Sequence, residues 1–324
     1  MTTFYLPFPM NSLKRLMQSG VARSGLLAIL LTVSVGAVAA EGAKLFATPE
    51  EAVAALAAAV SAQNPDALRA VFGPAVEEIE NPDRVQAAHE LSSFAAALSK
   101  ANRIARVSDS KCVVEVGDDF WPFAVPLAKK DGQWFFDTEA GKDEILTRRI
   151  GKNELSTLQS VRAYAEAQRN YAAKDRDGDE VLEYAQKIVS SPGKKDGLYW
   201  PPDLDGELSP LGPLIAQAQA EGYEARSKAE DEPREPYHGY YFRILTRQGK
   251  HAPGGKYDYV INGNMIGGFA LVAWPAEYGQ SGIMTFIVNQ QGKVYQKDLG
   301  PKTASAAKSI KAYDPDSTWT LSRD

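Results

Sequence analysis

The chain has 324 residues, with 41 acidic and 36 basic side chains and a formal net charge of −5. This mild acidic excess argues against nucleic acid or an anionic membrane surface as the partner, because both select strongly basic chains. The single cysteine, Cys112, excludes an internal disulfide, so the fold must be stabilised by its hydrophobic core. Cys112 lies in the strand-like run KCVVEV, and we expect it to be a core residue rather than a nucleophile.

The first 40 residues are typical of a secretory signal peptide. They contain basic residues but no acidic one, then an apolar run, then the small-residue sequence GAVAA. This order predicts export and cleavage after Ala39 or Ala40. An uncleaved membrane anchor is the alternative, because the uncharged stretch 24–40 is at the lower limit of a span. We therefore expect a periplasmic or secreted protein, with no membrane span after cleavage.

Residues 44–150 are predicted to form the first domain, and the length of the chain suffices for two. Capping residues next to proline predict three helices, beginning near Thr48, Asn64 and Asn81. After Asn102 the apolar period changes to two, which predicts antiparallel strands, and the sequence DG at 131–132 predicts a tight hairpin turn. Three helices followed by a curling antiparallel sheet resemble the NTF2-like cone fold.

Residues 151–324 are predicted to form the second domain, after a charged connection over 141–153. Helical spacing predicts a helix ending near Tyr171 and a second helical piece around 182–188. A short helix is expected after the Ser-Pro pair at 209–210, and another over 303–311. Between them, strands are expected in GYYFRIL, YDYVI, GGFALVAW, GIMTFIV and KVYQKDL. The expected fold class is therefore α+β.

Several motifs in a fixed order support a family resemblance. RRIGKNEL, AQRNYAAKDRDGD, DGLYWPP, SPLGPLI, PYHGYYFRIL, QGKHAPGGKYDY, GGFALVAWPAEYG and TFIVNQQGKVYQKDLG follow one another along the chain. Together they resemble a bacterial secreted family catalogued as domain of unknown function 2950. The resemblance implies an exported protein of a Gram-negative bacterium and carries over no catalytic residue. More loosely, 151–324 resembles the soluble domain of type IV pilins and pseudopilins, in which a helix is followed by an antiparallel sheet.

One loop has the composition of a metal site. Asp175, Asp177 and Asp179 alternate around Gly178, and three carboxylates on such a turn can converge on Ca²⁺. The loop is not an EF-hand, because its glycine stands at position 4 and Gln186 at position 12. The simpler interpretation is a polar loop in which Asp179 caps a following helix.

The histidines offer little material for catalysis. His238 and His251 flank the first strand of the second domain, and either could meet Asp258 or Glu277 in a cleft. A hydrolase acting on envelope polymers could use such carboxylate and histidine groups. However, the sequence has no G-x-S-x-G nucleophile turn and no H-E-x-x-H zinc motif.

The aromatic strand GYYFRIL offers a contact surface instead. Alternate side chains share a face, so Tyr241 and Arg243 lie opposite Tyr240, and one face is expected to pack on the long helix. Tyrosine and arginine on the other face suit glycan or protein contacts, as do Tyr257 and Trp200, although Trp200 could also fill the core.

The sequence thus favours an exported, non-catalytic protein that binds or assembles with an envelope protein or glycan. The envelope hydrolase is one alternative. The other is a carrier of a small ligand, which would need an open apolar pocket in the cone-like first domain.

Overall fold

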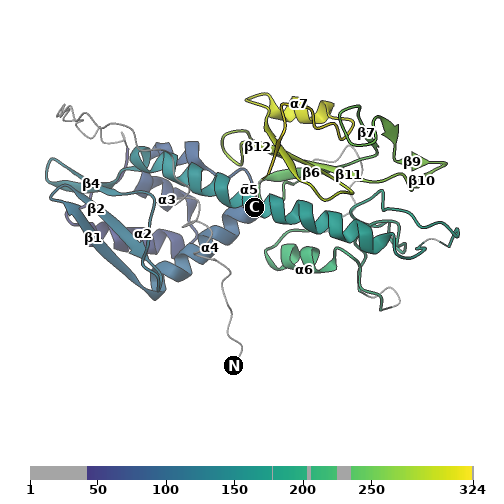
Figure 1. Ribbon diagram of the computed structural model, residues 1–324. Coiled ribbons are helices and arrows are strands. Elements are labelled where there is room, and N and C mark those ends of the chain that lie inside the picture. Colours follow the sequence, from purple (N-terminus) through teal and green to yellow (C-terminus); the bar gives the residue numbers. More distant parts are fainter. Residues whose placement is uncertain (1–41, 177, 203–205, 225–234, 323–324) are drawn as a thin grey trace. The chain divides into compact units, whose positions relative to one another are not determined.

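The computed structural model describes residues 42–176, 178–202, 206–224 and 235–322 (Figure 1). The predicted signal peptide and Asp177 lie outside these ranges. Residues 38–324 form one compact unit that contains both helices and antiparallel sheets, which confirms the predicted α+β class. Across the described ranges, every helix is too short or too polar to cross a membrane.

The N-terminal half begins with helices whose starts the sequence predicted. They are α2 (Pro49–Ser61), α3 (Pro65–Phe72), the 3-10 helix η1 (Pro74–Ile79) and α4 (Arg84–Lys100). Thr48 caps α2 and Asn64 caps α3, each accepting a hydrogen bond from the third amide beyond it. The third helix begins two residues later than expected, because Asp83 rather than Asn81 is its cap.

A five-stranded antiparallel sheet follows, in the order β1-β2-β4-β5 with β3 paired to β2. Its strands are β1 (Asn102–Ser108), β2 (Lys111–Val116), β3 (Trp121–Pro122), β4 (Leu127–Lys130) and β5 (Gln133–Phe136). The predicted turn at 131–132 joins β4 to β5, and both of its residues have positive φ, 50° and 84°. Cys112, Val114 and Val116 of β2 are buried toward the helices, so Cys112 is the core residue that the sequence predicted. Burial also raises the pKa of its thiol.

One long helix, α5 (Thr138–Tyr171), replaces the charged connection expected over 141–153. That expectation was wrong because charge alone does not end a helix: Asp137 caps the N-terminus. The charged side chains of 141–153 are exposed or half-buried except for Arg149, which is buried. The inward face is occupied by residues such as Gly141 and Asn153, while Arg149 donates to the carbonyl oxygens of Ile79 and Glu80. Helix α5 packs against η1 and, further along, against β11 and β12. The predicted domain boundary at 150 therefore falls inside a helix.

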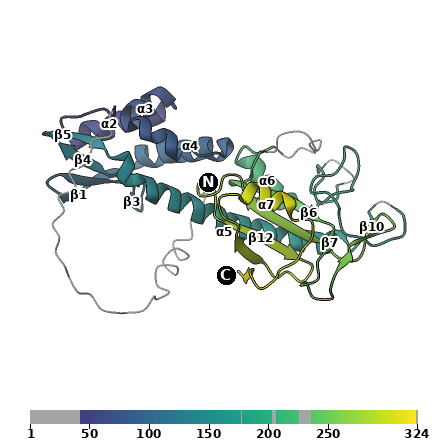
Figure 2. The same ribbon diagram turned by 90° about the horizontal axis from the view of Figure 1, so that it is seen from above.

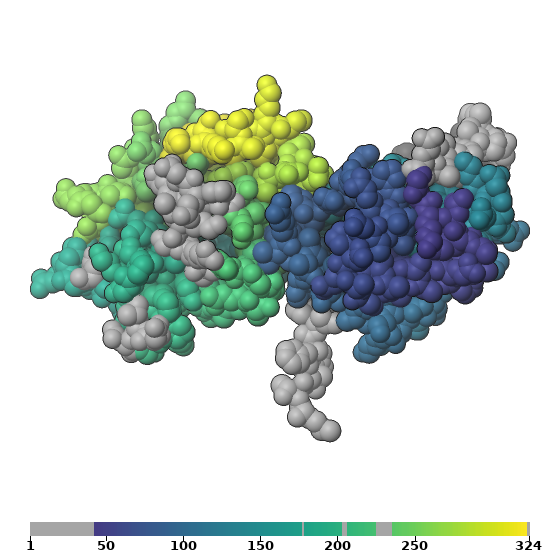
Figure 3. Space-filling view, turned by 180° about the vertical axis from the view of Figure 1, so that it is seen from behind, coloured from purple at the N-terminus to yellow at the C-terminus, as the bar shows by residue number. Residues whose placement is uncertain are grey.

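The C-terminal sheet is antiparallel, in the order β14-β13-β12-β11-β6. Its strands are β6 (Tyr240–Leu245), β11 (Ala270–Pro275), β12 (Met284–Asn289), β13 (Tyr295–Asp298) and β14 (Thr320–Leu321). Helix α5 covers one face and α7 (Thr303–Ser309) the other (Figure 2). The described residues from α7 to 322, yellow in Figure 3, form part of the surface of this half.

Short elements complete this half. They are α6 (Gly212–Ala220) and two small ladders, β7 (Arg247–Gln248) with β8 (Tyr257–Asp258) and β9 (Val260–Ile261) with β10 (Asn264–Met265). The helix predicted around 182–188 does not form. The main chain of this segment makes tertiary hydrogen bonds instead. The Gln168 side chain donates to the C=O of Ala185 and accepts from its N–H, at 2.8 Å each.

Candidate ligand-binding site

The two faces of β6 are both covered, which corrects the expectation of an open Tyr-Arg face. Tyr241, Arg243 and Leu245 point to the α7 side, and Tyr241 packs against Trp274 with ring centroids 5.8 Å apart. Tyr240, on the opposite face, is completely buried. Because α7 returns over the sheet, Tyr241 and Arg243 are half-buried and do not form an open surface.

Arg243 fixes the end of α7 to this strand. Its guanidinium donates hydrogen bonds to the carbonyl oxygens of Ala307, at 2.9 Å, Lys308, at 3.3 Å, and Ile310, at 2.5 Å. The last carbonyls of a helix have no partner within the helix and carry the negative end of its dipole. Arg243 therefore fixes the end of α7 to the sheet, and its half-buried guanidinium also lines the hollow described next.

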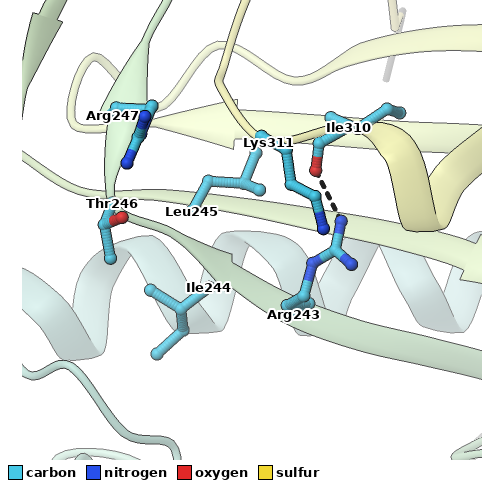
Figure 4. A pocket seen from close by; sticks show the side chains of 7 residues that line it. All are labelled: Arg243, Ile244, Leu245, Thr246, Arg247, Ile310 and Lys311. Atoms are coloured by element: carbon cyan, nitrogen blue, oxygen red, sulfur yellow. Dashed lines mark hydrogen bonds between the residues drawn. The ribbon is translucent and has the colours of Figure 1, made fainter.

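A hollow of about 260 Å³ lies next to this clamp. Figure 4 shows Arg243, Arg247 and Lys311 around it, with Leu245 between them and Ile310 beside Lys311, while Ile244 and Thr246 point to the other side of the strand. Every charged residue that lines it is basic. Arg247 contacts Asp258 at 3.5 Å (Nε to Oδ1), and both side chains are more than half exposed, so the ion pair is weak.

A second hollow, of about 290 Å³, lies on the other side of Ile310 and Lys311 and includes Asp314 and Trp319. The two hollows share Ile310 and Lys311 as lining residues, so they are neighbours. The first hollow combines guanidinium and ammonium groups with apolar side chains, which suits an anionic ligand held by charge-assisted hydrogen bonds.

The other predicted contact residues lie elsewhere. Trp200 is 1% exposed, and its indole N–H donates to the carbonyl oxygen of Glu207 at 2.9 Å, so it fills the core and is not a surface anchor. Tyr257 is exposed on β8, with its ring against Tyr259 at a centroid distance of 5.6 Å.

The two candidate histidines, His238 and His251, have partners that the sequence did not indicate. His238 contacts Glu221 at 2.9 Å, and His251 contacts Asp314 at 3.1 Å (Nδ1 to Oδ1). The expected pairing with Asp258 or Glu277 is absent among the described residues. Burial lowers the pKa of His238, although Glu221 opposes this shift.

The Asp175–Asp179 loop uses its described carboxylates in hydrogen bonds. Asp175 accepts from the amides of Gly178, at 2.7 Å, and Glu180, at 2.9 Å. Asp179 accepts from the amide of Val181, at 2.8 Å, and from Asn264, at 2.7 Å. Over the described ranges, which omit Asp177, no group of three or more possible metal ligands comes together. The segment after Asp179 is not helical, so the expected helix cap is also absent.

Sequence reasoning missed a buried polar cluster centred on Asp83. Its carboxylate accepts from the amide of Gln86, at 2.9 Å, from the hydroxyl of Tyr223, at 2.8 Å, and from the amide of Gly239, at 3.0 Å. Burial, together with Asp83, raises the pKa of Tyr223. The only signal in the sequence was a helix cap, and the other two partners are more than 100 residues away in the chain.

The same cluster continues into α5. Gln86 donates to the Oδ1 atom of Asn153 at 2.7 Å, and Asn153 donates to the carbonyl oxygen of Ser281 at 2.9 Å. These groups satisfy one another in the interior, which makes the cluster a structural link between α4, α5 and the C-terminal sheet.

A comparison with known protein families identifies the family of this chain. The family described as "Protein of unknown function (DUF2950)" matches residues 43–321, and the chain belongs to this family. No curated protein and no solved structure shows significant similarity to the chain.

Proposed function

We propose that this protein is an exported, non-catalytic module that binds an anionic ligand of the cell envelope, from a protein or a glycan. The observation that carries the proposal is the hollow lined by Arg243, Arg247 and Lys311 with apolar side chains between them. The proposed location, periplasmic or secreted, rests on the predicted signal peptide in residues 1–40.

The proposal includes the finer fold assignments. The N-terminal half packs α2, α3 and α4 on one side of a curved sheet with an irregularity between Arg106 and Ser108, which supports an NTF2-like cone. The C-terminal half packs a long helix on an antiparallel sheet, which supports a pilin-like domain. In this division, α5 belongs to both domains.

Binding is preferred to the two alternatives for specific reasons. The hydrolase was expected to pair His238 or His251 with Asp258 or Glu277, and the described residues show neither pairing: Asp258 contacts Arg247, His238 contacts Glu221 and His251 contacts Asp314. The carrier would need an open interior in the cone. Aromatic rings pack there with centroids 4.9–6.2 Å apart, namely those of Phe72, Phe94, Phe123 and Phe136.

The proposal can be tested with the chain purified in its exported form. Binding to immobilised polyglutamate and polygalacturonate should exceed binding to neutral dextran and should weaken as salt is added. Reversing two charges, Arg247→Glu with Lys311→Glu, should weaken binding by about tenfold or more. Lys130→Glu is the matched control, because Lys130 is an exposed lysine in the other sheet. Equal binding by the double variant and the wild type would refute the proposed site.

A further inference from the structure

Among the strands that the structure describes, β6 lies at the edge of the C-terminal sheet. It pairs with β11 on one side, and it is the last strand of the sheet order on the other. An edge strand presents main-chain N–H and C=O groups that another extended chain can pair with. Whether they are available depends on which residues of β6 point outward.

The hydrogen bonds at the two ends of β6 show whether its even-numbered or its odd-numbered residues direct their main-chain groups away from β11. Tyr240 exchanges both main-chain bonds with Tyr237, at 2.9 and 3.1 Å, and the carbonyl oxygen of Thr246 accepts from Tyr259 at 2.7 Å. These even-numbered residues therefore face away from β11. On the inner side, Gly239 accepts from Ala276 at 2.8 Å, so the odd-numbered residues face β11.

The same alternation directs the main-chain groups of Phe242 and Ile244 outward. Outside the strand ladders, no described main-chain group bonds to the N–H or C=O of Phe242 or Ile244, and both side chains are only half-buried. The contacts with Tyr237 and Tyr259 limit the open window to the two residues between them. A partner strand can thus pair over a short and defined length.

The basic hollow lies on the α7 side of β6. It is lined by consecutive residues of the chain from Arg243 to Arg247, together with Ile310 and Lys311. Side chains of an added strand alternate between the two faces of the sheet, so every second one would lie on the α7 side, next to the hollow. An acidic side chain there would meet cationic groups, and an aliphatic one would meet Leu245.

We infer that the ligand of this site is an extended acidic polypeptide segment that adds to β6 as a further strand and places a carboxylate side chain among Arg243, Arg247 and Lys311. Main-chain hydrogen bonds provide part of the affinity, and the hollow provides specificity for the acidic residue. This inference rests on the proposed function and narrows it, because a glycan cannot form the main-chain bonds.

The test uses the exported chain and the blocked peptide Ac-Thr-Glu-Val-Glu-Thr-NH₂, in which both glutamates share a face. The peptide should shift the amide NMR signals of Phe242 and Ile244 and slow their hydrogen exchange. The matching lysine peptide, Ac-Thr-Lys-Val-Lys-Thr-NH₂, should do neither.

Phe242→Pro is the decisive variant, because it removes an outward N–H without removing a bond to β11. It should weaken binding of the acidic peptide by about tenfold or more relative to Phe242→Ala, which loses the same ring but keeps the N–H. Lys311→Glu should have a comparable effect through charge.

The outcomes separate the two proposals. If Phe242→Pro binds the peptide as Phe242→Ala does, strand addition is overturned, while the anionic site stands as long as Arg247→Glu with Lys311→Glu abolishes binding. If polygalacturonate binds and the acidic peptide does not, strand addition is again overturned. If charge reversal has no effect, both proposals fall. Should the proline variant not fold, hydrogen exchange in the wild type decides, and unchanged exchange at Phe242 and Ile244 overturns strand addition.

Discussion

The two antiparallel sheets of this protein bury their strands in different ways. In β2 burial alternates, with Cys112, Val114 and Val116 inside and the residues between them more exposed. In β11 all six residues are buried, because α5 covers one face of this sheet and α7 the other. A sheet covered on one side leaves a period of two in the sequence, whereas a sheet covered on both sides leaves a continuous apolar run. The first pattern identifies the inner face, and the second does not.

Core truncation in the doubly covered sheet should have the largest effect. Phe286 of β12 is 1% exposed, so Phe286→Ala should lower the free energy of unfolding by about 3–5 kcal/mol. Val107→Ala in β1, where the side chain is 61% exposed, should change it by about 0.5 kcal/mol or less. Urea denaturation measures both, and similar costs would contradict the contrast between the sheets.

Substitutions in the Asp83 cluster should lower the free energy of unfolding nearly as much, because the cluster links α4 to the C-terminal half. Asp83→Ala removes the helix cap and leaves the Tyr223 hydroxyl and the Gly239 amide unpaired, which should cost roughly 3 kcal/mol. Tyr223→Phe removes one donor only and should cost about 1 kcal/mol. A double-mutant cycle by urea denaturation should show coupling between the two residues, and strict additivity would contradict the direct bond.

Replacing two glycines of α5 by alanine should change the stability of the protein in opposite directions. A Cβ on Gly141 would come within 2.8 Å of the Val125 main chain, so Gly141→Ala should destabilise the protein by about 1–3 kcal/mol. Gly151 has open space around it in the helix interior, so Gly151→Ala should stabilise by about 0.5–1 kcal/mol. Thermal unfolding measures both. Destabilisation by Gly151→Ala would contradict a continuous helix over 141–153.

The smallest effect is expected in the irregular segment of the C-terminal half. Hydrogen bonds from Lys174, Lys195 and Arg176 lower the pKa of Glu207 to about 2, from an ordinary value of 4.5. A carboxylate with a depressed pKa in the folded state stabilises fully above pH 4.5, and this contribution is lost as the pH falls toward 2. Urea midpoints of wild type should therefore fall more between pH 6 and pH 3 than those of Glu207→Gln. Parallel pH curves would contradict the shift.

Local chemistry in the sequence predicted the features that depend on neighbouring residues. Thr48 and Asn64 cap helices because their side chains reach amides three residues away, and the turn at 131–132 forms because its two residues tolerate positive φ. The family was also predicted from motif order alone and is confirmed by the match over residues 43–321.

Tertiary contacts decided the rest. The segment around Ala185 is not helical because the buried Gln168 side chain forms hydrogen bonds with its main-chain groups. The face of β6 that carries Tyr241 is covered because α7 folds back over the sheet. Asp83 and Arg243 acquire their roles from partners far along the chain. The sequence by itself determined caps, turns, strand periods and family, because these depend on local interactions. Which residues remain accessible for binding was decided only when distant segments packed together.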